Sequence, residues 1–305
     1  MIRIARIEAL RRYLDEHRRA GGSVGLVPTM GAFHAGHRSL MRIARERSNL
    51  VVVSLFVNPL QFGPAEDLAS YPRDPDGDAM IAEAEGVDAL FAPDPEEMYP
   101  RPMLTTVTVA GLGQGLCEAV RPGHFAGVAT VVTKLFAIVG PCRAFFGGKD
   151  AQQLAVVRRL ASDLDLPVEV VSCPTVRHSD GLAMSSRNAY LGPAERQAAT
   201  ALFRGLESAV SSARAGERNP VRLREQTVGA LADQPLVTPE YVQVLRAEDL
   251  SAFAPGEALD GEVLVAIAAR VGPARLIDNL TLRFEGRSVH ADLGVREEEV
   301  TCSAR

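Results

Sequence analysis

The chain has 305 residues and a mass of 32.7 kDa, a length that predicts about two domains, each able to bury its own core. Hydrophobic residues make up 47% and charged residues 23%, which excludes long disorder, collagen and coiled coil as descriptions of the whole chain. The chain carries 33 basic and 38 acidic residues and no tryptophan, so we expect no nucleic-acid partner.

The longest apolar stretch, residues 50–57, is too short to span a membrane. Residues 1–22 lack the apolar region of a secretory signal and are expected to form an amphipathic helix packed on the protein. The four cysteines lie far apart with no CxxC pair, so neither a zinc site nor a disulfide framework is indicated. We therefore expect a cytoplasmic protein that has reduced thiols and no membrane partner.

From residue 24 onward, short apolar segments alternate with helical ones. LVVVSLFVN, residues 50–58, is too continuously apolar to have a wet face, which is typical of a parallel sheet covered on both sides. The expected strands are 24–28, 50–58, 89–92, 105–109, 143–146 and 168–172, and the expected helices are 37–47, 78–85, 125–139 and 151–164. This order predicts an α/β fold, a doubly wound, Rossmann-like parallel sheet.

The pattern then changes. Two helices are expected at 193–214 and 220–233, and two strands at 241–245 and 262–268, which together suggest a smaller α+β domain. The boundary is expected in the loop between residues 175 and 187. We therefore predict a catalytic domain over residues 1–180 and a smaller domain over 181–305, with the last ~20 residues frayed.

The densest motif is PTMGAFHAGH, residues 28–37, which lies between an expected strand and an expected helix. Ligands bind at the carboxyl ends of strands in open parallel sheets, and the start of a helix offers N–H groups and a positive dipole. His34 and His37 flank Gly36, so both can face one bound anion. The alternatives are an ordinary turn with two histidines, and a metal pair, for which no third ligand has matching spacing.

The second motif is FVNPLQFGP, residues 56–64, at the end of the next strand. Asn58 and Gln61 should therefore reach the same sheet edge as the histidines. Because a neutral amide can both donate and accept, Gln61 suits a substrate that carries a carboxylate and hydroxyls. Taken alone, the segment can also be a plain loop.

The third motif is FFGGKDAQQL, residues 145–154, again a strand, a tight turn and a helix. Lys149 stands at the helix start, where a phosphate would bind, and Gln153 lies one turn further along. The segment is not a Walker A loop, since Asp150 replaces the Ser or Thr that follows the lysine. A solvated lysine in a turn is the alternative.

The fourth motif is DGLAMSSRNAYL, residues 180–191. Two hydroxyls and a guanidinium in succession, at Ser185, Ser186 and Arg187, suit a flexible phosphate clamp. A serine-rich linker between domains is the alternative.

Two other patterns are look-alikes. GLGQGL, residues 111–116, lacks the third glycine of a dinucleotide fingerprint. Asp74, Asp76, Asp78 and Glu85 match positions of a calcium-binding EF-hand loop, but Ala79 stands where that loop needs glycine, so we interpret this run as the start of a helix. We expect no metal site formed by the protein alone.

The four motifs, in this order, resemble the pantothenate synthetase (pantoate–β-alanine ligase) family, within the HxGH nucleotidyltransferase superfamily. Two further segments share the resemblance, RPGHFAGVATVVTKLF and ARVGPARLIDN. The resemblance covers roughly residues 1–285. It implies that pantoate attacks the α-phosphorus of ATP to give pantoyl adenylate and pyrophosphate, and that β-alanine then displaces AMP. It also implies Mg²⁺ brought with ATP, a homodimer, and a second domain that serves as a lid.

The same resemblance assigns residues to roles. His37 resembles the family's proton donor, with His34 beside it on the phosphates and Lys149 as a further catalytic group. Gln61 and Gln153 resemble the pair that holds pantoate. The remaining substrate positions are Asn58, Tyr71, Arg121 and His124. The expected ATP site is Met30, Gly31, Ala32, Phe33, His34, Ala35, Gly36, His37, Gly147, Gly148, Lys149, Asp150, Val176, Met184, Ser185, Ser186 and Arg187.

One position departs from the family, whose members usually have Glu where this chain has Gly148. Either that side chain is dispensable or ATP binding is altered, and we favour the first because the turn and Lys149 are present. The main alternative function is a nucleotidyltransferase that acts on a phosphate ester. An aminoacyl-tRNA synthetase is disfavoured by the acidic balance, and a non-catalytic binding module by the intact motifs.

Overall fold

The computed structural model describes residues 1–64, 66–112, 116 and 121–302. Residues 113–115 of GLGQGL and Cys117 lie outside the described residues. The chain divides into two compact units: unit 1 comprises residues 1–148 and 156–173, and unit 2 comprises residues 149–155 and those from 174 onward. The sequence places the boundary at residue 180, whereas the structure puts 149–155 and 174–180 with unit 2, because both segments bond to its strands.

Unit 1 contains a parallel sheet. Its six strands among the described residues are β1 (Ile2–Ile4), β2 (Val24–Thr29), β3 (Leu50–Leu55), β4 (Ala89–Phe91), β5 (Cys142–Gly147) and β6 (Val168–Cys173), in the order β1-β4-β3-β2-β5-β6. The helical segments are α1 (Ile7–Arg19), α2 (Ala35–Arg47), η1 (Pro59–Gln61), α3 (Pro75–Ala84), α4 (Pro95–Met98), α6 (His124–Val139) and most of α7 (Ala151–Asp163).

The sheet is covered on both faces. Val27, Val51 and Val53 pack with Leu40 and Met41 of α2. Neighbouring strand residues point to the opposite face, where α6 contacts β2 and α1 packs against α6. The predicted doubly wound sheet is therefore confirmed, and the carboxyl ends of β2 and β3 bring the first two motifs to one edge.

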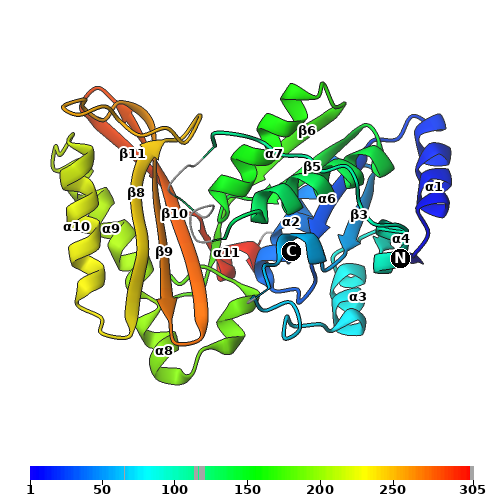
Figure 1. The fold of residues 1–305 in the computed structure, drawn as a ribbon, viewed down its shortest axis with the longest axis horizontal. Coiled ribbons are helices and arrows are strands. Elements are labelled where there is room, and N and C mark those ends of the chain that lie inside the picture. The colour runs from blue at the N-terminus through cyan, green and yellow to red at the C-terminus, as the bar shows by residue number, and fades with distance from the viewer. Residues whose placement is uncertain (65, 113–115, 117–120, 303–305) are drawn as a thin grey trace. The chain divides into compact units, whose positions relative to one another are not determined.

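Unit 2 contains an antiparallel sheet with helices on one face, on which α9 and α10 lie side by side (Figure 1). Its four strands among the described residues are β8 (Val237–Arg246), β9 (Gly261–Val271), β10 (Ala274–Glu285) and β11 (Ser288–Asp292), in the order β11-β10-β9-β8. The other elements are β7 (Val176–Arg177), η2 (Ser186–Tyr190), α8 (Pro193–Ala198), α9 (Ala201–Arg214), α10 (Pro220–Ala232), β12 (Val295–Arg296) and α11 (Glu297–Cys302).

Four expectations are wrong. Residues 2–4, expected within the first helix, instead form β1 and pair in parallel with β4. Residues 105–109 form no strand, because the amide of Val107 bonds to the Thr130 hydroxyl of α6 at 3.0 Å instead of pairing in a ladder. The helix expected at 193–214 is interrupted at 199–200, where the Thr200 hydroxyl bonds back to the Gln197 carbonyl. Residues 288–296 are not frayed, because β11 pairs with β10 and β12 pairs with β7.

No helix among the described residues is long and apolar enough to cross a membrane.

Candidate active site

The histidine motif forms the turn between β2 and α2. His34 is the N-cap of α2, and its Nδ1 accepts the amide of Gly36 at 3.1 Å. His37 reaches back, and its Nδ1 accepts the amide of His34 at 3.3 Å. Each imidazole therefore satisfies an amide that the helix itself leaves unpaired, and the two ring centroids lie 4.2 Å apart.

These bonds indicate the tautomer of each ring when it is neutral. A nitrogen that accepts a hydrogen bond carries no proton, so a neutral ring has its N–H at Nε2. Burial lowers the pKa of His37 from 6.5 to about 4, so its ring is neutral near pH 7. His37 thus presents a neutral Nε2–H donor at the start of a helix.

The chain just before the histidines is held by a buried carboxylate. Asp78 of α3 accepts the amides of Ala32 and Phe33 at 2.9 and 2.7 Å. Gly31 has a φ of +89°, and a Cβ there would lie 2.8 Å from the Asp78 carboxylate. Burial raises the pKa of Asp78 from its ordinary value, against the two amide bonds that lower it. The acidic run that mimics a calcium loop therefore contains the residue that shapes this turn.

Gln61 lies at the end of η1 and is 8% exposed. Its Nε2 donates to the sulfur of Met30 at 2.9 Å, so the first two motifs meet at the edge of the sheet, as predicted. Its Oε1 accepts from Asn58, which also bonds to the Gly127 carbonyl at 3.1 Å and accepts from the Tyr99 hydroxyl at 2.7 Å. Asn58 is 1% exposed, so its amide holds Gln61 from inside the protein.

The Gln61 backbone is also fixed. His124 Nδ1 donates to its carbonyl at 2.7 Å, and Arg121 donates to the same oxygen at 3.3 Å. Arg121 also pairs with Glu66, and this hydrogen bond is the main cause that lowers the pKa of Glu66. Tyr71, 6% exposed, packs its ring edge-on against Phe62 next to Gln61. Every predicted pantoate residue of unit 1 thus belongs to one cluster around Gln61.

Gly147 is the last residue of β5, and Gly148 follows it. The Gly148 amide bonds to the Cys173 carbonyl of β6 at 2.8 Å. A Cβ at Gly148 would lie 3.2 Å from that carbonyl oxygen, which is a tight contact. The glycine therefore lets the turn approach β6 more closely than a glutamate would.

The remaining predicted residues belong to unit 2. Asp150 caps α7 by accepting the amide of Gln153 at 3.1 Å. The amide of Met184 bonds to the carbonyl of Val176 at 2.9 Å, so these two positions are adjacent. The Ser185 hydroxyl accepts the amide of Arg187 at 3.3 Å and begins η2, which contains Ser186.

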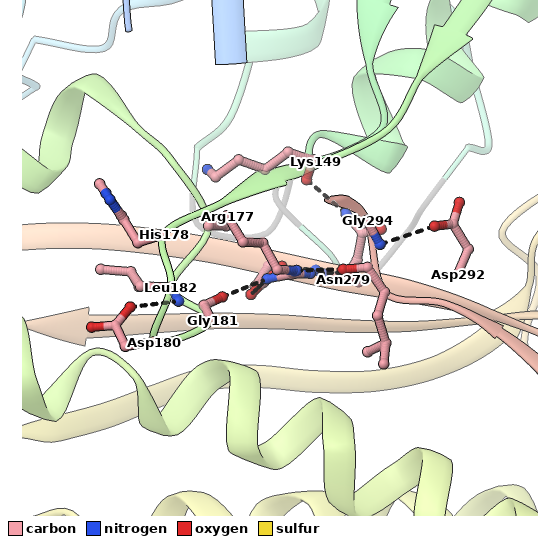
Figure 2. A network of polar contacts seen from close by, with 12 residues as sticks. Lys149, Arg177, His178, Asp180, Gly181, Leu182, Asn279, Asp292 and Gly294 are labelled. Carbon is pink, nitrogen blue, oxygen red and sulfur yellow. Dashed lines mark hydrogen bonds and ion pairs between the residues drawn. The ribbon is translucent and has the colours of Figure 1, made fainter. Parts of the chain in front are cut away.

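Lys149 is held through its backbone (Figure 2). Asn279 of β10 donates to the Lys149 carbonyl at 2.6 Å. The neighbouring Asp278 pairs with Arg177 through two bonds of 2.7 and 3.0 Å, and both side chains are 1% exposed. Burial lowers the pKa of Lys149, while the carboxylates of Asp278 and Asp150 oppose that shift. ARVGPARLIDN therefore supplies the support for Lys149, a contact that the sequence did not reveal.

Chemically, the two units offer different groups. Unit 1 presents two imidazoles at a helix start, with His37 neutral, and an amide cluster, and unit 2 presents a lysine, hydroxyls and a guanidinium. The described residues contain no group of three or more carboxylate, imidazole or thiol side chains that could hold a metal ion. The parallel sheet and the His34–Gly36–His37 turn at its edge are the features of the HxGH superfamily.

The comparisons give the particular family. The pantoate-beta-alanine ligase model matches residues 3–281, and the chain belongs to this family. It is 53% identical over 279 residues to the pantothenate synthetase of Heliobacterium modesticaldum, covering 92% of this chain and 98% of that relative.

Solved structures agree. Pantothenate synthetase from Thermus thermophilus matches with a TM-score of 0.86 and 45% identity over 92% of this chain and 98% of that one. The pantoate–β-alanine ligase of Francisella tularensis, complexed with beta-gamma ATP and β-alanine, matches with a TM-score of 0.75 and 30% identity over 94% of this chain and 100% of that one.

Proposed function

We propose that this chain makes pantothenate in two steps, with the residues of each unit in the roles given below. In the first step a carboxylate oxygen of pantoate bonds to the α-phosphorus of ATP, and the bond to the bridging oxygen breaks to release pyrophosphate. In the second step the amine of β-alanine bonds to the acyl carbon, and the bond from that carbon to the oxygen bridging it to phosphorus breaks. AMP leaves with the bridging oxygen, and the amine loses a proton.

The His34–His37 pair carries this proposal. A neutral Nε2–H beside a helix start donates a hydrogen bond to phosphate oxygens as negative charge develops on them, and needs no proton transfer to do so. His37 is therefore assigned as the donor to the reacting phosphates, with His34 next to it. Met30 to Phe33 supply the backbone of the turn that Asp78 holds.

Gln61 is assigned to pantoate, and to the acyl group of the adenylate in the second step. Its side chain bonds to the neutral amide of Asn58 and the sulfur of Met30, and the Arg121 guanidinium on its backbone carbonyl is paired with Glu66. These surroundings suit an acid with hydroxyls better than a phosphate ester. Asn58, Arg121 and His124 act on pantoate through Gln61, since each bonds to it directly. Gln153, one turn into α7, is assigned to the same substrate.

In unit 2, Lys149 and Arg187 are assigned to the phosphates of ATP, with hydroxyls from Ser185 and Ser186. Val176 and Met184 are both buried and adjacent, and are assigned to the nucleoside. Gly147, Gly148 and Asp150 shape the turn around Lys149, so the glutamate usual in the family is dispensable here. Mg²⁺ enters as the MgATP complex, with its ligands supplied mainly by phosphate oxygens.

We further propose that the chain acts as a homodimer in the cytoplasm. Light scattering on the purified protein measures its mass in solution, and a monomer at working concentration would contradict the dimer.

Pyrophosphate exchange tests the function directly. With MgATP and labelled pyrophosphate, exchange into ATP is expected only when pantoate is present, because only the carboxylate can attack the α-phosphorus. Adding β-alanine should give AMP and pantothenate in equal amounts. Exchange without pantoate, or a nucleotide-linked final product, would overturn the proposal in favour of a transferase.

A further inference from the structure

Residues 282–302, which follow the family match, form regular secondary structure in three further elements, β11, β12 and α11. The match ends at residue 281, within β10. Beyond it, β11 completes the antiparallel sheet, and β12 pairs in parallel with β7, placing Val295 opposite Val176 and Arg296 opposite Arg177. The amide of Val295 also bonds to the Thr175 carbonyl at 2.9 Å.

The partner of β12 is the strand assigned to the nucleotide. On its other edge β7 bonds to the returning chain, where Met184 donates to Val176 and a bridge joins Arg177 to Ala183. This hairpin, residues 176–184, leads directly into the hydroxyls and guanidinium of 185–187. We call residues 184–187 the nucleotide segment, because they are assigned to ATP. β7 therefore has β12 on one edge and the chain that leads into the nucleotide segment on the other.

Side chains stabilise the same contact. Arg177 Nε donates to the Leu293 carbonyl at 2.5 Å, and Arg296 donates to the His178 carbonyl at 2.8 Å. His178 Nδ1 lies 3.7 Å from the carboxylate of Glu297. Arg177 also donates to the Gly181 carbonyl at 3.1 Å, so the buried arginine joins β12, the hairpin turn and β10.

Gly294 permits the approach. Its φ is +77°, and a Cβ there would lie 2.1 Å from the Thr175 carbonyl oxygen. Because that oxygen is backbone, it cannot swing aside as a flexible side chain would. Any larger residue at 294 must therefore push β12 away from β7.

We infer that residues 293–297 form a positioning strand for ATP binding. By pairing the outer edge of β7 and tying down the hairpin turn, they order the nucleotide segment before the ligand arrives. Binding then does not have to order that segment. The inference rests on the proposed function only for the assignment of Val176 and residues 184–187 to ATP.

A matched pair of glycine substitutions tests it. Gly294→Ala is expected to weaken ATP binding about tenfold, the equivalent of ~1.4 kcal/mol, while the KM for pantoate stays unchanged. Gly286→Ala is the control, because Gly286 also has a positive φ, of +59°, but its Cβ would meet nothing within 4 Å. The control also places a side chain at a positive φ, but without the clash, and should bind ATP normally.

ATP affinity is measured by calorimetry in the absence of pantoate and β-alanine, so the result does not depend on turnover. Unchanged ATP affinity in folded Gly294→Ala, or equal losses for ATP and pantoate, overturns the inference. A wild-type chain that binds ATP but makes no pantothenate counts against the proposed function alone.

If Gly294→Ala does not fold, Arg296→Ala replaces it. This change removes the bond to His178 and the contact of the guanidinium with the Phe203 ring at 5.0 Å. Arg287→Ala, at an exposed position between β10 and β11, is the matched control. Selective loss of ATP affinity in the first variant supports the inference, and equal affinity in both overturns it.

Discussion

His37 combines a structural bond and a reactive donor on one ring. Its Nδ1 accepts an amide of the α2 cap, and burial lowers its pKa to about 4. Protonation at Nδ1 would break that bond, so the ring stays neutral through roughly pH 5 to 8, the range in which an ordinary histidine titrates. The donor at Nε2 is therefore present at every working pH.

We predict that His37→Ala slows adenylate formation by about 10² to 10³-fold, the scale for loss of one donor to a developing charge. His37→Gln, which places an amide N–H at a similar reach, should recover part of the rate. The measurement is single-turnover pyrophosphate release, with circular dichroism to confirm folding.

The same neutral ring gives a pH expectation. The folded pKa lies below the ordinary 6.5, so the folded state binds fewer protons than the unfolded state between these values, and stability falls as pH drops through this window. NMR titration of His37 should give a midpoint near 4. A midpoint near 6.5 would remove the neutral-donor argument.

Sequence reasoning found the residues that carry recognisable chemistry and missed those that support them. His34, His37 and Gln61 were predicted from motif position, and the structure brings Gln61 to Met30 as expected. The role of Asp78 could not be predicted, because its partners are backbone amides, which leave no trace in side-chain identity.

At the scale of elements, η1 and α6 meet at a glycine. A Cβ on Gly127 would lie 2.1 Å from the Leu60 carbonyl oxygen and 2.7 Å from the Gln61 amide nitrogen. The α6 backbone therefore abuts the turn that positions Gln61.

We predict that Gly127→Ala raises the KM for pantoate by about 10-fold or more, since even a 1 Å displacement of a positioning group can cost ~10²-fold. Gly229→Ala in α10 is the control, because its Cβ would meet nothing within 4 Å. There the exchange should stabilise the helix by about 1 kcal/mol. Steady-state kinetics and thermal unfolding of both variants check this, and an unchanged pantoate KM in Gly127→Ala would contradict it.

Strands buried on both faces were predictable from continuous apolar runs, as β3 shows. β10 was missed although its buried positions alternate strictly along 274–285. Its pattern is broken by Asp278, a charge on the buried face whose partner Arg177 lies 101 residues away. A pairing over that distance in the chain gives no local signal.

For the whole molecule, the two steps of the reaction separate the roles of the units. Lys149, in unit 2, is assigned to phosphates, and Gln61, in unit 1, to the acyl group. Pyrophosphate has left before the second step, and only contacts that strengthen in a transition state accelerate that step.

We predict that Lys149→Ala slows adenylate formation by at least ~10²-fold but loses much less when given ready-made pantoyl adenylate and β-alanine. Gln61→Ala should impair both steps. Single-turnover measurements of each step check this prediction. Equal losses in both steps for Lys149→Ala would mean that the lysine only maintains the shape of its turn.

The imidazole cap of α2 restricts which substitutions evolution can accept at the start of this helix. An aspartate would cap the helix but present no donor to a phosphate, and a lysine or arginine would donate but could not accept an amide. A serine hydroxyl can do both, but its single oxygen has a much shorter reach than an imidazole ring. Histidine has an acceptor and a donor on opposite sides of one rigid ring. Helix stability and phosphate recognition therefore depend on the same two side chains, so a substitution of either histidine changes both properties.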